Sequence, residues 1–321
     1  MYLCVTKGLA KTFRTMDLSI IVPLYNEEES VVLLHEAIKK SVDKVGFSYE
    51  ILFVDDGSKD NTVPLVSKLV ENDKHLRIIK FRRNYGQTPA MAAGIDNARG
   101  EILVTMDGDL QNDPDDIPEL VSKVKEGYDI VVGWRHNRQD KLVTRKIPSK
   151  IANKLIGKVT GVPIKDNGCS LKAYRSHIIK NIPLYSEMHR FIPAMTSLAG
   201  TKIAEVKVNH HARAFGESKY GLSRIYKVLI DLLVIKTILT SFSKPLRMFA
   251  AGAIVSLTAA LTFLIIGINQ IGVSGGVIFF GISILYGSLA FFLLFWGILG
   301  ELVYQTGNLK LEHFAQIKKE V

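Results

Sequence analysis

The sequence predicts an α/β domain with a mostly parallel sheet and helices on both faces, followed by an amphipathic interfacial helix and two transmembrane helices. Three observations predict this class. Short apolar runs alternate with amphipathic helical patterns from Leu18 onward, which is typical of parallel strands joined by crossover helices. Two uncharged stretches near the C-terminus are each long enough to cross a bilayer. A basic amphipathic segment lies between the two regions.

The strand and helix patterns follow one another in order from residue 18 to residue 133. Expected strands cover residues 18–22, 49–54, 76–81, 102–106 and 129–133. Expected helices cover residues 28–45, 61–72, 88–98 and 115–126. Ligands of such sheets bind beyond the carboxyl ends of the strands, where this chain has Asp55 and Asp56 after one strand and Asp107 and Asp109 after another. No glycine-rich phosphate loop follows the first strand, so a dinucleotide-binding or P-loop enzyme is disfavoured.

The stretch after the fourth expected strand carries the clearest chemical signal. An apolar run, residues 102–106, leads into Asp107, Gly108 and Asp109, with Gln111 close behind. Side chains alternate along an extended strand, so we expect both acids on one side, with Gly108 allowing a ligand to approach closely. Two carboxylates and an amide oxygen suit Mg²⁺ or Mn²⁺, which keep positions for water and substrate phosphates. From Asp-x-Asp alone, a solvated turn is the alternative.

Basic residues dominate the second half of the soluble region. The stretch 134–146 contains arginines that could hold a phosphate through paired hydrogen bonds, and a solvated loop is the alternative. Asp166 offers a lone acid in an expected turn, with an ordinary Asx-turn as the alternative. Residues 222–242 fit a helix on or near the membrane surface, with a helix packed against the soluble domain as the alternative. From residue 213 to residue 247 there are seven Lys or Arg and two acids, a net charge of +5 that would attract anionic headgroups or a phosphate.

Residues 248–272 and 273–300 predict two membrane spans, because neither contains a charged residue. Lys and Arg precede the first span and follow the second, and the turn between them has none. The positive-inside tendency therefore predicts that both termini are cytoplasmic. The expected location is the inner membrane. Two buried helices of a soluble protein are the alternative.

Two cysteines give no disulfide framework, and residues 1–16 lack the apolar core of a signal peptide.

Four motifs occur in order along the chain. They are Ser19-Ile-Ile-Val-Pro-Leu-Tyr-Asn-Glu-Glu28, Val54-Asp-Asp-Gly-Ser58 with Asp60, Asp107-Gly-Asp-Leu-Gln111 with Pro114, and Gly216 with Ser218-Lys-Tyr220. Together with the two spans, this set resembles the polyprenyl-phosphate branch of glycosyltransferase family 2, which includes dolichyl-phosphate mannose synthases and bacterial bactoprenol glucosyltransferases. The resemblance runs from residue 18 to the C-terminus. It implies a GT-A fold and inverting transfer of a sugar from a nucleotide donor to a polyprenyl phosphate.

The resemblance also implies site residues by position. The nucleotide-sugar pocket would contain Pro23, Tyr25, Glu27, Asp55, Asp56 and Asp107. The divalent metal, Mg²⁺ or Mn²⁺, would be held by Asp107, Asp109 and Gln111. The acceptor phosphate would be bound by Arg135, Arg145, Ser149, Arg213 and Lys219. The implied catalytic residues are Asp107, Asp109, Asp166 and Arg135. The stretch from Asp166 to Leu171 departs from the family pattern, in which a small residue, Ser or Thr, Gly and an aromatic residue follow the acid.

The chemistry of the acceptor suggests a role for Asp166. A phosphate monoester has a second pKa of about 6, so it is already anionic near neutral pH and needs little help from a general base. It does need cationic groups that hold it against repulsion from the donor. We therefore hypothesise that Asp166 orients one of the arginines and does not take a proton.

These inferences divide the chain into five parts and leave several functions to compare. The parts are a leader (1–17), a cytoplasmic catalytic domain (18–212), a basic juxtamembrane segment (213–247), two transmembrane helices (248–304) and a cytoplasmic tail (305–321). UDP-glucose and undecaprenyl phosphate are the expected substrates, in cell-surface glycan modification, and a GDP-mannose-dependent mannose synthase is the alternative. A processive polysaccharide synthase and a non-catalytic membrane scaffold are further rivals. Small residues in the spans allow a homo-oligomer, and no nucleic-acid partner is expected.

Overall fold

The computed structural model describes residues 16–136, 147–182, 184, 186, 188–197, 200–212, 230–237, 245–271 and 276–306. The chain divides into two compact units, Met1–Leu232 and Leu233–Val321, and each is described by itself. Arg145, Arg213 and Lys219, all predicted to bind the acceptor phosphate, lie outside the described residues. So do most of the predicted leader and of the predicted helix at 222–242.

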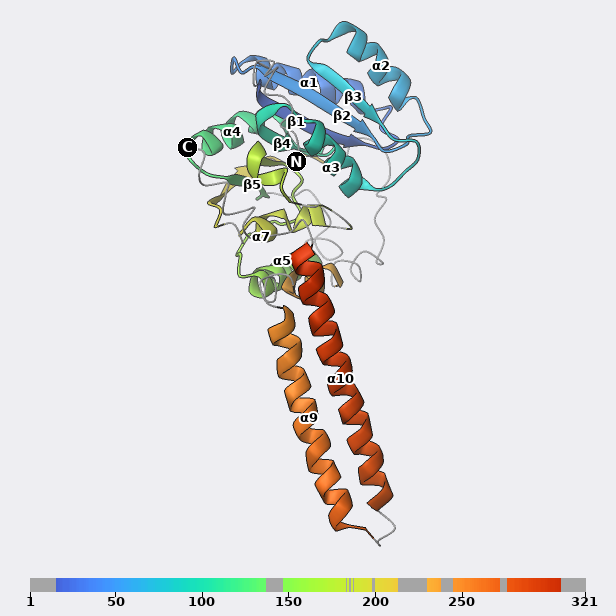
Figure 1. Ribbon diagram of the computed structural model, residues 1–321. Coiled ribbons are helices and arrows are strands. Elements are labelled where there is room, and N and C mark those ends of the chain that lie inside the picture. The colour runs from blue at the N-terminus through green and yellow to red at the C-terminus, as the bar shows by residue number, and fades with distance from the viewer. Residues whose placement is uncertain are drawn as a thin grey trace, which may run out of the picture. The chain divides into compact units, whose positions relative to one another are not determined.

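Seven strands form one sheet in the order β3-β2-β1-β4-β6-β5-β7 (Figure 1). The strands are β1 (Met16–Leu24), β2 (Tyr49–Asp55), β3 (Leu76–Lys80), β4 (Gly100–Thr105), β5 (Ile130–Arg135), β6 (Lys172–Arg175) and β7 (Ile203–Val208). Strands β1 to β4 are parallel to one another, and β5 is parallel to β7, whereas β6 runs antiparallel to both β4 and β5. The prediction of a mostly parallel sheet is therefore confirmed.

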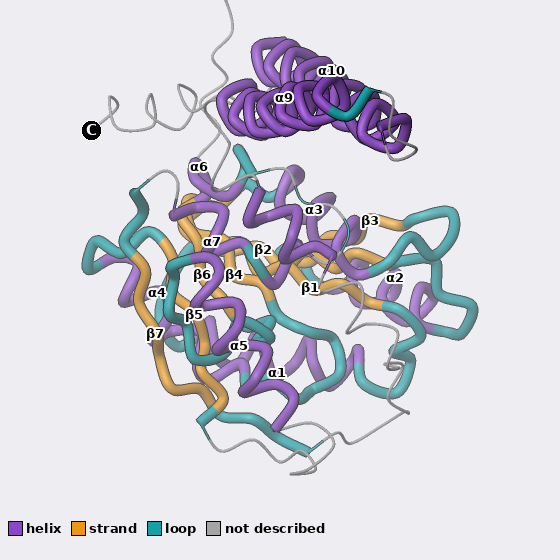
Figure 2. The backbone as a smooth tube through the Cα atoms, turned by 90° about the horizontal axis from the view of Figure 1, so that it is seen from below, coloured by secondary structure: helices purple, strands orange, loops and turns teal. Residues whose placement is uncertain are grey.

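Helices pack on both faces of this sheet (Figure 2). They are α1 (Val31–Asp43), α2 (Thr62–Asn72), α3 (Gln87–Asn97), α4 (Ile117–Lys125), α5 (Ile147–Thr160), α6 (Ser176–Ile179) and α7 (Ile192–Ser197), with 3-10 turns η1 (Pro114–Asp116) and η3 (Met188–Arg190). Ile20 and Val22 of β1 pack with α1, α2 and α4, while Ile21 packs with α3 on the other face. This alternation explains why successive residues in the middle of the central strands are apolar, because both faces of each strand are buried.

A buried ionic cluster joins α1 to the turn before β3. The carboxylate of Asp73 accepts hydrogen bonds from the backbone N–H of His75 (2.9 Å) and from Lys39 Nζ (3.3 Å), and lies 3.0 Å from His35 Nε2. Burial by itself raises the pKa of Asp73, but these hydrogen bonds outweigh burial and lower the pKa from 3.8 to about 2. The ionised carboxylate therefore stabilises the folded state.

Replacing Asp73 with Asn is expected to lower the free energy of unfolding at pH 7 by about 2 kcal/mol. The pKa of Asp73 is lower in the folded state, so its contribution is complete above about pH 4 and is lost as the pH falls towards 2. Urea unfolding of both proteins should show the difference shrinking by roughly half at pH 3. Exposed Asp96, replaced by Asn, is the matched control. An equal difference at both pH values would contradict the assignment.

The second unit is a pair of long apolar helices, α9 (Pro245–Asn269) and α10 (Gly276–Thr306). Each is long and apolar enough to span a membrane, as the sequence predicted. Small residues of α9 pack against α10: Ser283 Oγ donates a hydrogen bond to the carbonyl of Ala260 at 2.8 Å, and a Cβ added to Gly252 would lie 3.4 Å from the side chain of Leu293. The small residues of the first span thus pack the two helices of one chain together.

Candidate active site

The carboxyl ends of β1 and β2 bring the first two motifs together. Pro23 pairs with Val54 in the sheet, and the backbone N–H of Asp56 donates to the carbonyl of Leu24 at 2.8 Å. Asp55 is fully buried, and its carboxylate accepts hydrogen bonds from the backbone N–H groups of the turn that follows it, at 3.2 to 3.3 Å. Three residues predicted to contact the nucleotide, Pro23, Tyr25 and Asp55, thus lie at one edge of the sheet.

Asp56 holds the loop that leads into α3, which we call the α3 entry loop (residues 81–86). Its two carboxylate oxygens accept hydrogen bonds from the backbone N–H groups of Tyr85 (2.7 Å) and Gly86 (2.8 Å). Burial is the largest influence on Asp56 and raises its pKa above the usual value, with these hydrogen bonds acting in the opposite direction. Asp56 therefore shapes the loop beside the predicted nucleotide pocket.

Glu27 connects the first motif to the loop of the predicted metal ligands, the metal loop (residues 106–111). The Ser30 hydroxyl lies 2.8 Å from Glu27 Oε2 and 3.0 Å from the carbonyl oxygen of Gly108, and can donate to either. The backbone N–H of Glu27 donates to Thr62 Oγ1 at 2.8 Å. Glu27 is therefore positioned by α1, α2 and the metal loop together.

The metal loop differs from the sequence prediction in its backbone. Strand β4 ends at Thr105, so Asp107 and Asp109 lie beyond the strand and the alternation argument does not reach them. The backbone turns instead, with Leu110 at φ +61° and the N–H of Gln111 donating to Asp109 Oδ1 at 3.2 Å. Gly108 also lies close to β1, because an added Cβ would lie 2.7 Å from a methyl of Leu24. The expected approach of a ligand at Gly108 stays a prediction.

The chemistry of the metal loop fits a divalent cation that substrate helps to coordinate. Asp107, Asp109 and Gln111 are all partly exposed, within one short turn. Within the described part of the chain, no group of three or more His, Cys, Asp and Glu could hold a metal alone. Two carboxylates and an amide form a partial ligand set, which suits Mg²⁺ or Mn²⁺ because these ions keep water and substrate phosphates as ligands.

Arg135 and Asp166 form a buried, two-pronged ion pair. Arg135 Nε donates to Asp166 Oδ2 at 2.7 Å and Nη2 donates to Oδ1 at 2.9 Å, with side-chain exposures of 13% and 4%. Burial opposes the charged guanidinium, but Asp166 outweighs burial, with a further contribution from Asp107, and the pKa of Arg135 is raised. This is the contact that the orienting hypothesis requires. The catalytic role of the pair stays a prediction.

The predicted acceptor-phosphate residues are placed only in part. Arg135 ends β5, and Ser149 lies near the start of α5 and is partly exposed. The other three residues of that set lie outside the described residues. The arginine pair and the metal loop lie at the same edge of the sheet, because β4 and β5 both run antiparallel to β6 and therefore end on the same side. The charge of Asp107 accordingly contributes to raising the pKa of Arg135.

Sequence reasoning missed four polar residues that connect the metal loop to Asp166. Gln87 Nε2 donates to Asp107 Oδ1 at 2.7 Å, and the next residue, Thr88, places Oγ1 2.7 Å from His189 Nδ1. Lys172 Nζ donates to the carbonyls of Asn167 (3.2 Å) and His189 (3.4 Å). Burial lowers the pKa of Lys172 to about 8. The only sequence signal was a lysine between apolar residues, Leu171 and Ala173.

Replacing Thr88 with Val is expected to lower turnover about 5- to 10-fold, since one buried hydrogen bond is worth about 1 kcal/mol. The substitution keeps the side-chain shape but removes the hydroxyl beside buried His189. The measurement is kcat for sugar transfer, with the affinity for UDP expected to change less than about threefold. Thr88→Ser, which keeps the hydroxyl, is the control and should recover most of the loss. Equal turnover in Thr88→Val and wild type would show that the contact is dispensable.

Comparison with known proteins agrees with this geometry. Residues 19–182 match the model of glycosyl transferase family 2. The chain is 42% identical over 311 residues to the dodecaprenyl-phosphate galacturonate synthase of Rhizobium johnstonii, covering 94% of this chain and 91% of that protein. It is 41% identical over 233 residues to the undecaprenyl-phosphate 4-deoxy-4-formamido-L-arabinose transferase of Shewanella sediminis, covering 72% and 69%.

A solved structure supports the fold. Glucosyl-3-phosphoglycerate synthase from Mycobacterium tuberculosis, in complex with Mn²⁺ and UDP-glucose, matches with a TM-score of 0.54 and 18% identity over 70% of this chain and 79% of that chain. At this identity the likeness shows the fold alone, a GT-A-like α/β arrangement as predicted. The names of the two relatives confirm the resemblance to the polyprenyl-phosphate branch. The chain therefore belongs to glycosyltransferase family 2 and is a glycosyltransferase.

Proposed function

We propose that this protein transfers a sugar, with inversion, from a UDP-sugar to a polyprenyl phosphate at the cytoplasmic face of the inner membrane. The observation that carries the proposal is the pairing of two sites at one sheet edge. A metal loop with Asp107 and Asp109 lies within electrostatic reach of the buried Arg135–Asp166 pair, in a chain that also has two candidate membrane spans. The metal loop suits a diphosphate donor, and the Arg135–Asp166 pair suits an anionic acceptor.

The donor half holds the diphosphate. Asp107, Asp109 and Gln111 would coordinate Mg²⁺ or Mn²⁺, and a bound ion there would neutralise the charge on the departing nucleoside diphosphate. Gln87 donates a 2.7 Å hydrogen bond to one oxygen of Asp107, and the other oxygen would serve as the ligand of the ion. Structural relatives bound to Mn²⁺ and UDP support divalent metal dependence in general.

The acceptor half presents cations to the phosphate. Asp166 holds the guanidinium of Arg135 in a fixed plane, and a planar guanidinium binds phosphate through two hydrogen bonds. Ser149, Arg145, Arg213 and Lys219 are proposed to complete this half. The acceptor needs no proton removed, so the protein's contribution is to hold the phosphate in line with the sugar.

The sugar has three candidates. Glucose, from UDP-glucose, is the sugar expected from the sequence, with undecaprenyl phosphate as the acceptor. Galacturonate is the second candidate, because the relative that matches 94% of this chain is named as a galacturonate synthase. Mannose, from GDP-mannose, is the third candidate, because the sequence left it open as the alternative donor.

Radiolabel transfer tests the proposal. Full-length protein is incubated with undecaprenyl phosphate and a panel of UDP-sugars and GDP-mannose, with Mg²⁺, Mn²⁺ or EDTA. We expect lipid-linked label from one donor class, present with metal and absent with EDTA. Metal-independent label would contradict the metal site. Absence of label from every donor, despite metal-dependent UDP binding, would mean that the acceptor or the sugar is wrong.

A further inference from the structure

Residues 166–171, which lead from Asp166 into β6, form neither a helix nor a strand. We call them the Asp166 segment. The segment turns sharply, because the N–H of Cys169 donates to the carbonyl of Asp166 at 3.3 Å. It also packs tightly on the ion pair: a Cβ added to Gly168 would lie 3.3 Å from Arg135 Nη2 and 3.6 Å from Asp166 Oδ1. A shift of this segment would therefore shift the guanidinium as well.

One residue of this segment, Ser170, is bonded to both ends of the metal loop. Immediately before the loop, Thr105 Oγ1 donates to the carbonyl of Ser170 at 2.8 Å. Immediately after the loop, Asn112 Nδ2 donates to the hydroxyl oxygen of Ser170, also at 2.8 Å. All three residues are buried, where the low dielectric strengthens a hydrogen bond. The metal loop and the Asp166 segment are thus tied together at one buried residue.

The backbone of Asn112 is anchored separately, by the chain that follows β7. Asn112 forms an antiparallel bridge with His210, and the N–H of His211 donates to the carbonyl of Gln111 at 2.9 Å. These backbone contacts do not involve Ser170. The side chain of Asn112 therefore acts as a spacer between an anchored backbone and the Asp166 segment.

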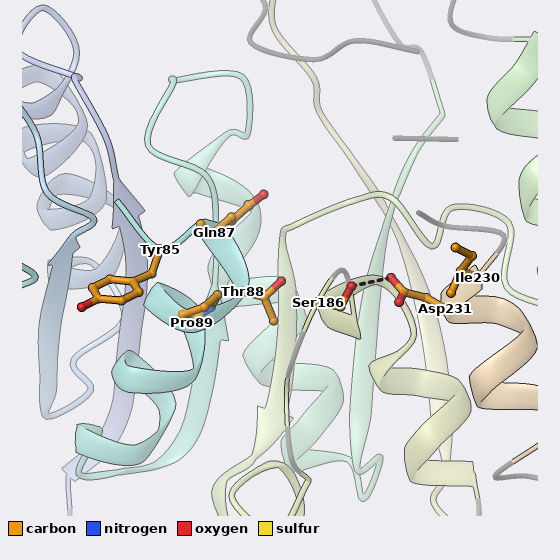
Figure 3. Close-up of a pocket in the computed structure, with 8 residues that line it drawn as sticks. Tyr85, Gln87, Thr88, Pro89, Ser186, Ile230 and Asp231 are labelled. Carbon is orange, nitrogen blue, oxygen red and sulfur yellow. Dashed lines mark hydrogen bonds between the residues drawn. The ribbon is translucent and has the colours of Figure 1, made fainter. Parts of the chain in front are cut away.

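The middle of the metal loop is held by other elements. Gln87, at the start of α3 and on the wall of a cavity of about 450 Å³ (Figure 3), donates to Asp107 Oδ1 at 2.7 Å. The Ser30 hydroxyl, just before α1, lies 3.0 Å from the carbonyl oxygen of Gly108. These contacts fix the loop against α1 and α3. The hydrogen bonds at Ser170 add the connection to the Asp166 segment.

Sugar transfer needs the acceptor phosphate in line with the bond that breaks, and a misplacement of about 1 Å costs about 100-fold in rate. In the proposed function, the metal loop places the donor's diphosphate, and Asp166 places the guanidinium that holds the acceptor. Both lie outside the strands, so the sheet alone does not set the distance between them.

We propose that Asn112 and Ser170 are positioning residues, and that their hydrogen bond sets the distance between the donor's metal and the acceptor's phosphate. The proposal rests on the proposed function and adds two residues to it. Both side chains are buried, so they act through the metal loop and Asp166 and do not touch a substrate.

Kinetics test this role by removing either partner of the hydrogen bond. With full-length enzyme, Mn²⁺, undecaprenyl phosphate and the donor that wild type uses, Ser170→Ala should lower kcat about 10-fold, because both substrates bind but meet out of line. The Kd of UDP with Mn²⁺ and the KM for undecaprenyl phosphate should each change less than about threefold. Asn112→Ala, which leaves the Asp166 segment unaltered, should have the same effect. The double variant should be little worse than either, because both changes break one contact.

Nuclear relaxation reports the distance without any transfer. Bound Mn²⁺ speeds the relaxation of the phosphorus nucleus of farnesyl phosphate, more steeply the closer the two lie, and UDP replaces the donor so that nothing reacts. The enzyme-dependent enhancement should fall in Ser170→Ala and in Asn112→Ala, because the metal and the phosphate lie farther apart. Ser19→Ala is the matched control: it removes a buried hydroxyl that donates to Glu50 Oε1 at 2.7 Å, towards the amino end of β1. It should keep the turnover and relaxation of wild type.

Each outcome separates the positioning role from the proposed reaction. Unchanged turnover or unchanged relaxation in both variants would overturn the role of Asn112 and Ser170. Loss of Mn²⁺-dependent UDP binding in both would also overturn it, because the defect would then lie within the metal loop. Enhanced relaxation in wild type without transfer from any donor would fault the proposed reaction alone. No enhancement in wild type would mean that the acceptor phosphate does not bind beside the metal, and would overturn both.

Discussion

Replacing Asp109 with Ala is expected to reduce sugar transfer about 1,000-fold, which corresponds to about 4 kcal/mol of transition-state stabilisation. Asp109 is one of only two carboxylates in the metal loop, and the described residues include no larger acidic cluster that could replace it. Its loss leaves Asp107 and Gln111, too few ligands to hold an ion against water. The charge on the departing diphosphate would then be uncompensated.

Activity and metal-dependent binding together check this prediction. UDP affinity is measured by calorimetry with and without Mn²⁺, and the increase that Mn²⁺ gives to wild type should be absent in Asp109→Ala. Asp115→Asn is the control, since Asp115 lies six residues away and its side chain is exposed. Among the described residues, its one ion pair is with Lys44, at 3.7 Å. It should keep transfer within about twofold. If Asp109→Ala keeps metal-dependent transfer within tenfold of wild type, then Asp109 is not a metal ligand.

The parallel part of the fold could be predicted because its strands are buried on both faces. Each of β1, β2 and β4 contains a buried apolar run, at residues 20–22, 51–54 and 102–104, flanked by polar residues or by Pro23. Strand β6 was not predicted, since it has four residues and begins with Lys172. That lysine is stabilised by carbonyls of Asn167 and His189, and the second contact spans 17 residues of sequence. Local patterns cannot anticipate such a partner.

The candidate site shows the same division between local and distant signals. The metal loop is a local motif, so its residue types alone indicate the ligand chemistry. Its backbone did not follow the strand pattern, because β4 ends two residues before Asp107. Gln87 and Thr88 were missed because their partners, Asp107 and His189, lie 20 and 101 residues away. Only the folded sheet places these residues next to one another.

Replacing Asp166 with Asn is expected to lower turnover about 10- to 100-fold while metal-dependent UDP binding changes less than about threefold. Asp166 accepts two hydrogen bonds from Arg135, whereas Asn offers one oxygen and an NH₂ group that faces the guanidinium. Arg135 would lose its buried counter-charge and its fixed plane. The loss should appear as a raised KM for polyprenyl phosphate together with a lower kcat. If Asp166→Asn fails to bind UDP in the presence of Mn²⁺, the orienting role of Asp166 is wrong.

A double-mutant cycle separates orientation from proton transfer. If Asp166 acts only through Arg135, then Arg135→Lys, which cannot form the two-pronged pair, should cost about as much as Asp166→Asn. The double variant should then be little worse than either single variant, because each change already breaks the same unit. If Asp166 instead took a proton from the acceptor, its effect would persist in the Arg135→Lys background and the two losses would add. A phosphate monoester that is anionic near neutral pH gives the enzyme no proton to remove, so we expect the non-additive result.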